Sequence, residues 1–398
     1  MTMIERTQYL NQLIQFKDTD FIKVITGVRR CGKSVLLQQY RDYLKSTKIK
    51  ESSIIYINFE SFDYQFIRDE VSFHNLLESI LPKKGKFYLL IDEIQFVENW
   101  QKVINSVRAS FSCDIVITGS NAKMLSGELA TFLSGRYVEI PIYPLSFREF
   151  LLAKNISEDS RYVDSAYLEY ETYGGFPGVV LADESIKDTI LSGIFDSIVL
   201  NDIAYRANLK DTPVLNNVVR FMADNVGQLI NSSKIANTLK SEHIDSSVHT
   251  INRYIELLTN AFLFFQAKQY DLRGKEYLKT NSKYFMVDNG LRRYAVGQRT
   301  GNFGNRLENI VYIELLRRGY SIDVGRIQSK EIDFICRRHD EILYVQVTYQ
   351  MPENTHESDN LLLIPDNFKK IIITGRYSDT KEISGIPILY IVDWLLQD

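Results

Sequence analysis

The sequence predicts an α/β protein built from several domains, and three observations lead to this prediction. The chain has 398 residues, more than one hydrophobic core usually supports, so roughly two to four domains are expected. In the first third, short apolar β-type runs alternate with segments of helical periodicity, the pattern of a parallel sheet with helices. Further along, two short helices precede a hairpin, and the C-terminal segment again mixes helix and strands. We expect boundaries at residues 1–150, 151–211, 212–300 and 301–398.

Composition narrows the class of protein. Hydrophobic residues make up 45% and charged residues 24% of the chain, which is normal for a globular protein. No apolar run reaches the roughly 18 residues of a transmembrane helix, so no membrane is expected as a partner. Cys31, Cys113 and Cys336 lie too far apart for a disulfide framework or a zinc site, which fits a reducing, cytoplasmic environment. The net charge is −3, yet residues 212–300 hold 12 Lys and Arg against 7 Asp and Glu, which indicates a basic part within an acidic protein.

The strongest motif follows the first predicted strand, Phe21–Thr26. Residues 27–34 read GVRRCGKS, a G-x-x-x-x-G-K-S pattern that lies between this strand and a helix. Glycines let successive backbone N–H groups face one phosphate, and the helix N-terminus adds partial positive charge. Lys33 can reach the β- and γ-phosphates of a nucleotide, and the Ser34 hydroxyl can bind Mg²⁺. The predicted nucleotide-binding residues are Gly27, Arg30, Cys31, Gly32, Lys33, Ser34, Val35 and Ser120.

A second site element is the run FYLLIDE at residues 87–93. Its five apolar residues suit a strand buried on both faces of a parallel sheet. Asp92 falls at the carboxyl end, where ligands bind in open α/β sheets. We expect Asp92 to hold Mg²⁺ through water and Glu93 to polarise the attacking water as a catalytic residue.

Two further catalytic candidates follow. The strand DIVIT ends before Gly119, and the polar Ser120 or Asn121 behind it is suited to sense a γ-phosphate or orient water. Arg136 precedes the next strand. It is either an arginine finger, acting in cis or in trans on the transferring phosphoryl group, or an ordinary surface arginine, and the sequence leaves both open.

These motifs together resemble a known family. GVRRCGKS, LLIDEIQ, ITGSNA, LSGR and PLSFREF, in this order, are similar to prokaryotic AAA-type ATPases of uncharacterised role. The resemblance implies an AAA-like domain that uses ATP and Mg²⁺, a helical lid, a winged helix and a restriction-endonuclease-like C-terminal domain. It implies Gly32, Lys33 and Ser34 as Walker A, Asp92 and Glu93 as Walker B, Ser120 or Asn121 as sensor 1, and Arg136 as the finger candidate.

The middle of the chain predicts helices and a winged helix-turn-helix. Residues 151–210 have helical patterns, interrupted at residues 173–178 by YGGFPG, which predicts a tight turn. Two short helices and a β-hairpin then follow Pro213. Asn252 and Arg253 are candidates for DNA bases, and Arg273 and Lys275 for phosphates. The same module also serves as a packing surface for proteins, and this alternative stays open.

The C-terminal part predicts a nuclease-like fold that has lost part of its site. Glu308, on a predicted helix, and Asp333, at the start of a central hairpin, match two metal-binding acids of restriction-endonuclease-like domains. The second strand of the hairpin offers Gln346-Val347-Thr348 where active members carry an acid and a lysine. Threonine cannot replace lysine as a cation, so we expect no metal-dependent cleavage of nucleic acid here.

The sequence therefore predicts a Mg²⁺-dependent ATPase that works as a nucleic-acid-directed switch or motor, with ATP and ADP, DNA and further copies of itself as candidate partners. One alternative is a nucleotide-gated module whose winged helix and nuclease-like domain dock protein partners. The other is an ATP-dependent nuclease. Stimulation of ATP hydrolysis by DNA, or only by a protein, distinguishes the first two.

Overall fold

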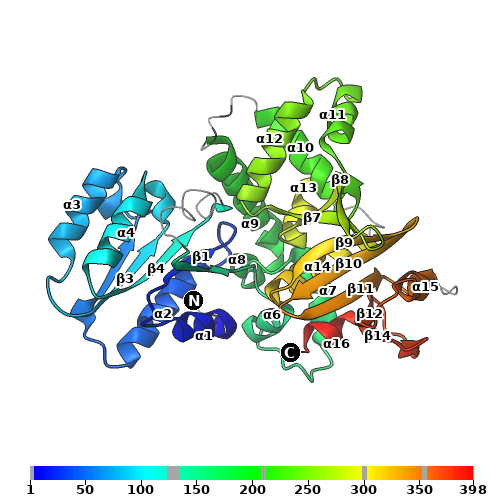
Figure 1. The fold of residues 1–398 in the computed structure, drawn as a ribbon, viewed down its shortest axis with the longest axis horizontal. Helices are drawn as coiled ribbons and strands as arrows, with labels where there is room; N and C mark the ends of the chain where they lie inside the picture. The colour runs from blue at the N-terminus through cyan, green and yellow to red at the C-terminus, as the bar shows by residue number, and fades with distance from the viewer. Residues whose placement is uncertain are drawn as a thin grey trace. The chain divides into compact units, whose positions relative to one another are not determined.

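The computed structural model describes residues 4–122, 135–205, 207, 209, 212–297, 303–351 and 356–397. The chain divides into two compact units (Figure 1). The first unit holds residues 1–142 with 260–262, and the second holds 143–259 with 263–398. Within the described ranges, no helix is both long and apolar enough to cross a membrane.

The first unit is a five-stranded parallel sheet between helices. Its strand order is β2-β3-β4-β1-β5. The strands are β1 (Ile22–Thr26), β2 (Ile54–Asn58), β3 (Phe87–Asp92), β4 (Cys113–Gly119) and β5 (Tyr137–Pro141). The helices α3 (Glu70–Ile80) and α4 (Trp100–Ser110) cover one face, and α1 (Thr7–Gln15) and α2 (Lys33–Ser46) cover the other (Figure 1). The predicted parallel-sheet domain is confirmed.

Burial on both faces explains the composition of these strands. Every residue of β1 and β3 is buried, as their apolar runs require. Lys23 on β1 is a charged residue in this otherwise apolar interior. Its Nζ lies 2.9 Å from Asp114 Oδ1 on β4, and both side chains are fully buried. A buried charge is tolerated only when it is paired, so this ion pair ties the two central strands together.

The second unit begins with helices. These are α6 (Phe147–Ala153), α7 (Val163–Tyr173), α8 (Pro177–Val180), α9 (Glu184–Asp196), the π-helical η5 (Ser197–Tyr205), α10 (Thr212–Asp224), α11 (Ser232–Ser241), α12 (Val248–Asn260) and α13 (Asn289–Val296). The helices α10 to α12 precede the hairpin of β7 (Phe264–Asp271) and β8 (Glu276–Met286), which is the element order expected for a winged helix. The winged-helix assignment itself stays a prediction.

One sheet continues from this hairpin into the C-terminal part. Its order is β13-β14-β12-β11-β10-β9-β7-β8-β6. Its other strands are β6 (Leu229–Ile230), β9 (Ser321–Ile327), β10 (Lys330–Arg338), β11 (Glu341–Thr348), β12 (Lys369–Thr374), β13 (Glu382–Ile383) and β14 (Ile386–Tyr390). Its helices are α14 (Phe303–Arg317), α15 (His356–Leu362) and α16 (Ile391–Leu395). Because β7 pairs with β9, the segments on either side of residue 300 share a sheet. The boundaries at 150, 211 and 300 stay predictions.

The predicted turn is shorter than expected, because α7 ends at Tyr173 and α8 already begins at Pro177. A buried carboxylate fixes this turn. Asp288 caps α13 by accepting hydrogen bonds from the N–H groups of Gly290 (2.8 Å) and Leu291 (3.3 Å). Its other oxygen accepts from Gly175 N at 2.7 Å. Burial raises the pKa of Asp288 to about 6. A Cβ on Gly290 would lie 2.1 Å from the carbonyl oxygen of Tyr173, so the turn and α13 approach too closely for any side chain there.

We therefore predict that Gly290→Ala destabilises the second unit by about 2–4 kcal/mol, because backbone atoms must move to admit the methyl group. Gly193→Ala is the matched control, since a Cβ at this exposed position on α9 meets nothing within 4 Å. It should stabilise by about 0.5–1 kcal/mol through helix propensity. Urea unfolding followed by circular dichroism measures both. Equal stability of the two variants would contradict the packing described.

Candidate nucleotide-binding site

The loop of residues 27–32 joins the carboxyl end of β1 to α2. Gly27 and Gly32 have φ values of 150° and 108°, which disfavour residues with a side chain. A Cβ on Gly27 would lie 2.3 Å from the Ile142 carbonyl oxygen and 3.0 Å from Cys31 Sγ. Cys31 is buried and burial raises the pKa of its thiol, so it packs as a small apolar group. The Ile142 carbonyl and the Cys31 side chain thus leave no room for a side chain at Gly27.

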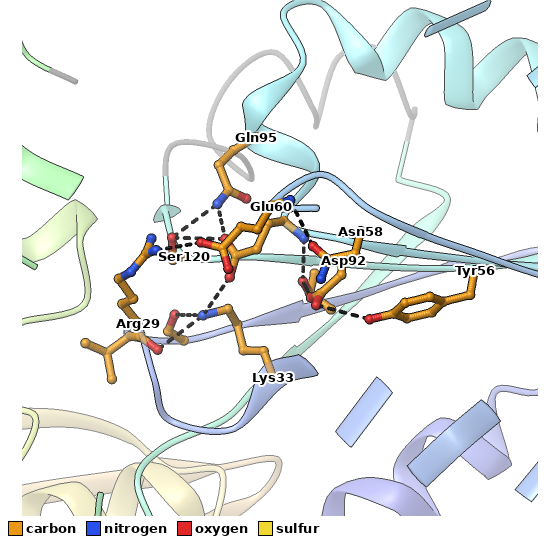
Figure 2. Close-up of polar contacts among 12 residues, drawn as sticks. Arg29, Lys33, Tyr56, Asn58, Glu60, Asp92, Gln95 and Ser120 are labelled. Atoms are coloured by element: carbon orange, nitrogen blue, oxygen red, sulfur yellow. Dashed lines mark hydrogen bonds and ion pairs between the residues drawn. The ribbon is translucent and has the colours of Figure 1, made fainter. Parts of the chain in front are cut away.

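Lys33 is held inside this loop. Its side chain is almost fully buried, and Nζ donates to the carbonyl oxygens of Gly27 and Val28, each at 3.2 Å. The same Nζ lies 3.5 Å from Glu93 Oε1. Figure 2 shows Lys33 pointing toward the acidic groups at the edge of the sheet. A phosphate entering the loop offers this ammonium a better partner than two carbonyl groups.

Asp92 and Glu93 lie at the end of β3, beside β4. Asp92 is 1% exposed, and its Oδ1 accepts a hydrogen bond from Thr118 Oγ1 at 2.5 Å. Thr118 Oγ1 in turn accepts from the backbone N–H of Glu93 at 2.9 Å. Tyr56 OH donates to the other Asp92 oxygen at 3.4 Å. Burial raises the pKa of Asp92, and hydrogen bonds from Thr118 and Ser34 oppose this shift. One threonine hydroxyl thus positions both acids.

Glu93 is restrained by its neighbours. Its backbone is left-handed, with φ of 55°. Its Oε2 accepts hydrogen bonds from Gln95 Nε2 and, at 3.4 Å, from Ser120 Oγ, and Gln95 Nε2 also donates to Ser120 Oγ at 3.3 Å (Figure 2). With Lys33 on its other oxygen, the carboxylate is engaged on both sides. It must exchange these partners before it can act on a water molecule.

The donor set fits Mg²⁺. Ser34 is exposed at the start of α2 and bonds the buried Asp92, so a hydroxyl and a carboxylate oxygen meet beside the phosphate loop. Magnesium prefers such hard oxygen ligands and retains several waters. Among the other predicted residues, Arg30 has φ of 65°, Val35 is 41% exposed, and Asn121 follows Ser120 at half-buried depth.

Arg136 lies at the opposite edge of the sheet. Its carbonyl oxygen accepts from Ile22 N at 3.0 Å, at the start of β1. Because β5 runs parallel to β1, the length of β1 separates Arg136 from the phosphate loop, and five strand residues span roughly 15 Å. This placement favours a role toward another subunit, or none as an ordinary surface arginine, over an action in cis. The arginine-finger assignment stays a prediction.

Three positioning residues were not predicted from the sequence: Thr118, Gln95 and Arg6. Arg6 is buried, and its Nη1 donates to the Cys31 carbonyl at 3.0 Å, which holds the phosphate loop from the N-terminal side. Thr118 looks like any β-branched strand residue, and Arg6 is 21 residues before the motif. Of these three residues, only Gln95 lies within a motif of the sequence, LLIDEIQ.

The DNA-binding candidates lie on the second unit. Asn252, Arg273 and Lys275 are exposed, the last two in the β7–β8 turn, where Asp271 Oδ1 accepts from the N–H groups of Arg273 and Gly274. Arg253 is also exposed, but its Nη2 donates to the Ala207 carbonyl at 3.2 Å. This hydrogen bond occupies part of the Arg253 guanidinium within the protein.

The nuclease-like candidates are brought together. Asp333 N donates to Gln346 Oε1 at 3.4 Å, and Asp333 Oδ2 accepts from Val347 N at 2.8 Å. Asp333 and Glu308 both face Lys283 Nζ, at 3.6 and 2.7 Å. Lys283 belongs to β8, and no motif in the sequence predicted a lysine from that strand at this place.

Comparisons with known proteins agree with this geometry. The profile of a family described as an AAA domain matches residues 19–151, and that of a domain of unknown function, DUF8612, matches residues 164–302. An uncharacterized protein of Haemophilus influenzae is 67% identical over 396 residues, 99% of each chain. The uncharacterized protein MJ1544 of Methanocaldococcus jannaschii is 34% identical over 378 residues, 90% of this chain and 82% of that one.

The fold is also found among solved structures. The Walker-type ATPase PABY2304 of Pyrococcus abyssi matches with a TM-score of 0.50 at 14% identity, and the match covers 73% of this chain and 95% of that chain. Together with the profile match, this shows that the first unit has the fold of AAA-type P-loop ATPases.

We predict that Thr118→Val destabilises the protein by about 1–3 kcal/mol, because the Asp92 carboxylate and the Glu93 N–H lose their shared partner in a buried place. Thr118→Ser keeps the hydroxyl and should stay within about 1 kcal/mol of the wild type. Urea unfolding measures both changes. A valine variant as stable as the serine variant would show that the hydroxyl bridge contributes nothing.

Proposed function

The chain belongs to the family of the Haemophilus influenzae and Methanocaldococcus jannaschii proteins and carries an AAA domain, and from this premise we propose that it binds and hydrolyses ATP with Mg²⁺. The observation that carries the proposal is the meeting of Lys33 and Glu93 across the phosphate loop, with Asp92 beside them. A cation for the phosphates, a base for water and a metal ligand are the parts that phosphoryl transfer to water needs.

Each residue has a role in this proposal. The backbone N–H groups of residues 27–32 receive the β-phosphate, and Lys33 moves from the carbonyls of Gly27 and Val28 to the phosphate oxygens. Ser34 and Asp92 would hold Mg²⁺, and the bound ion would supply positive charge to the phosphates. Glu93 loses its contact with Lys33 as the ammonium turns to the nucleotide, and it then accepts the proton of the attacking water. Occupation of the loop and release of the base are thus linked.

We predict that Lys33→Ala abolishes ATP hydrolysis, since the ammonium is the main counter-charge for the γ-phosphate. Glu93→Gln should keep nucleotide binding while turnover falls about 10²–10⁴-fold, the usual contribution of a general base. Phosphate release and fluorescent-nucleotide titration, run on the same preparations, measure the two properties. Full hydrolysis by Lys33→Ala would refute the assignment of this loop.

For the output of the ATPase, we favour a nucleic-acid-directed role over docking of protein partners. The support is the exposed β7–β8 turn, which carries Arg273 and Lys275, and the exposed Asn252 on α12. Such a turn suits phosphate contacts. The rival role as a protein-interaction module predicts ATP hydrolysis that responds to a protein and not to DNA.

We predict that Arg273→Ala/Lys275→Ala weakens binding of double-stranded DNA and lowers the slope of log affinity against log salt by about 2, one for each lost phosphate contact. Lys83→Ala/Lys84→Ala removes the same charge from an exposed loop of the first unit and serves as the control. Electrophoretic titrations at two salt concentrations measure the slope. Absence of wild-type binding even at low salt would reject the nucleic-acid role.

A further inference from the structure

A buried lysine lies where the nuclease-like site would hold its metal. Lys283 Nζ on β8 lies 2.7 Å from Glu308 Oε1 on α14, 2.8 Å from Glu331 Oε1 on β10 and 3.6 Å from Asp333 Oδ1 on the same strand. We call these four residues the Lys283 cluster. The lysine side chain is 4% exposed, so solvent hardly reaches the ammonium.

Charge keeps this lysine ionised. Burial alone lowers the pKa of Lys283, but the charges of Glu308, Asp333 and Glu331 outweigh it and raise that pKa above its usual value. Burial also raises the pKa of the Glu308 carboxyl, and Lys283 opposes that shift. The three acids therefore share one neighbouring cation.

The surrounding backbone holds the acids around that cation. Asp333 is anchored through its other oxygen to Val347 N. Glu308 is confined from the opposite side by Gly227, where a Cβ would lie 2.7 Å from Glu308 Oε2. In the described ranges, no three His, Cys, Asp or Glu side chains already form a group that could hold a metal ion. The Lys283 ammonium is the centre around which these acids are arranged.

We propose that the Lys283 ammonium is the resident cation of this cluster, and that removing it uncovers a divalent-cation site formed by Glu308, Glu331 and Asp333. Carboxylate oxygens from a helix and a strand, beside the Gln346 carbonyl, are ligands that Mg²⁺ and Mn²⁺ accept. In the wild type, lysine takes the place of the metal, ties β8 to β10 and α14, and leaves no cation to activate water. The hairpin strand β11 carries no lysine, and Lys283 of β8 brings an ammonium to this place instead. There it forms ion pairs with the acids and does not act beside a metal.

The test compares full-length, nucleotide-free wild type, Lys283→Met and Lys283→Met/Asp333→Asn in EDTA and in millimolar MnCl₂. Methionine keeps the length of lysine and removes the charge. We expect the wild-type Tm to be the same in both buffers. The Tm of Lys283→Met should fall by roughly 5–15 °C in EDTA, since buried acids lose their partner, and at least half of the loss should return in MnCl₂ but not in the double variant.

Any Mn²⁺ effect from the phosphate loop appears equally in all three proteins, so it does not mimic this pattern. If Lys283→Met does not fold in EDTA, its refolding yield with and without MnCl₂ gives the answer. No recovery with Mn²⁺ by either measure contradicts the proposal. So does a wild-type protein that nicks plasmid DNA with Mn²⁺ and loses this activity on Asp333→Ala.

Discussion

The position of β4 between β1 and β3 is the constraint on which the candidate ATP site depends. All neighbouring strands of this sheet run parallel, so their carboxyl ends meet at one edge. The phosphate loop follows β1, Asp92 ends β3 with Glu93 directly behind it, and Thr118 is the next-to-last residue of β4. Because β4 lies between β1 and β3, one strand separates Glu93 from the phosphate loop. The Lys33 side chain reaches across this distance to Glu93.

The same physical rule governs the polar interior of both units: a buried charge is kept only with a partner. In the first unit, Lys23 is paired with Asp114. In the second unit, Asp288 is paired with backbone N–H groups and Lys283 with three carboxylates. These contacts join segments that are distant in the chain. The candidate ATP site differs in that Lys33 and Glu93 satisfy one another only until a nucleotide supplies a better partner.

Local sequence was sufficient to locate the phosphate loop and the acids of β3. The strand, the glycine turn and the helix that form the loop follow one another within a few residues, so the pattern is recognisable in one short segment. It was insufficient wherever pairing between distant segments decides the outcome. Arg136 could be placed only once β5 was known to run parallel to β1. Lys283 is 25 residues from Glu308 in the chain and lies in a part predicted to be separate, so no local pattern indicated their contact. Its charge is counted in the basic balance of residues 212–300. The structure shows that this charge is internal.

In the proposed mechanism, the nucleotide takes Lys33 from the loop carbonyls and so frees Glu93. The most direct measurement is a crystal structure of the full chain with Mg²⁺ and a non-hydrolysable ATP analogue. We expect Lys33 Nζ on the β- and γ-phosphate oxygens, Mg²⁺ on Ser34, and Glu93 separated from Lys33 and turned toward a water molecule. A nucleotide bound in the loop with the Lys33–Glu93 contact unchanged, or a nucleotide bound elsewhere, would contradict this claim.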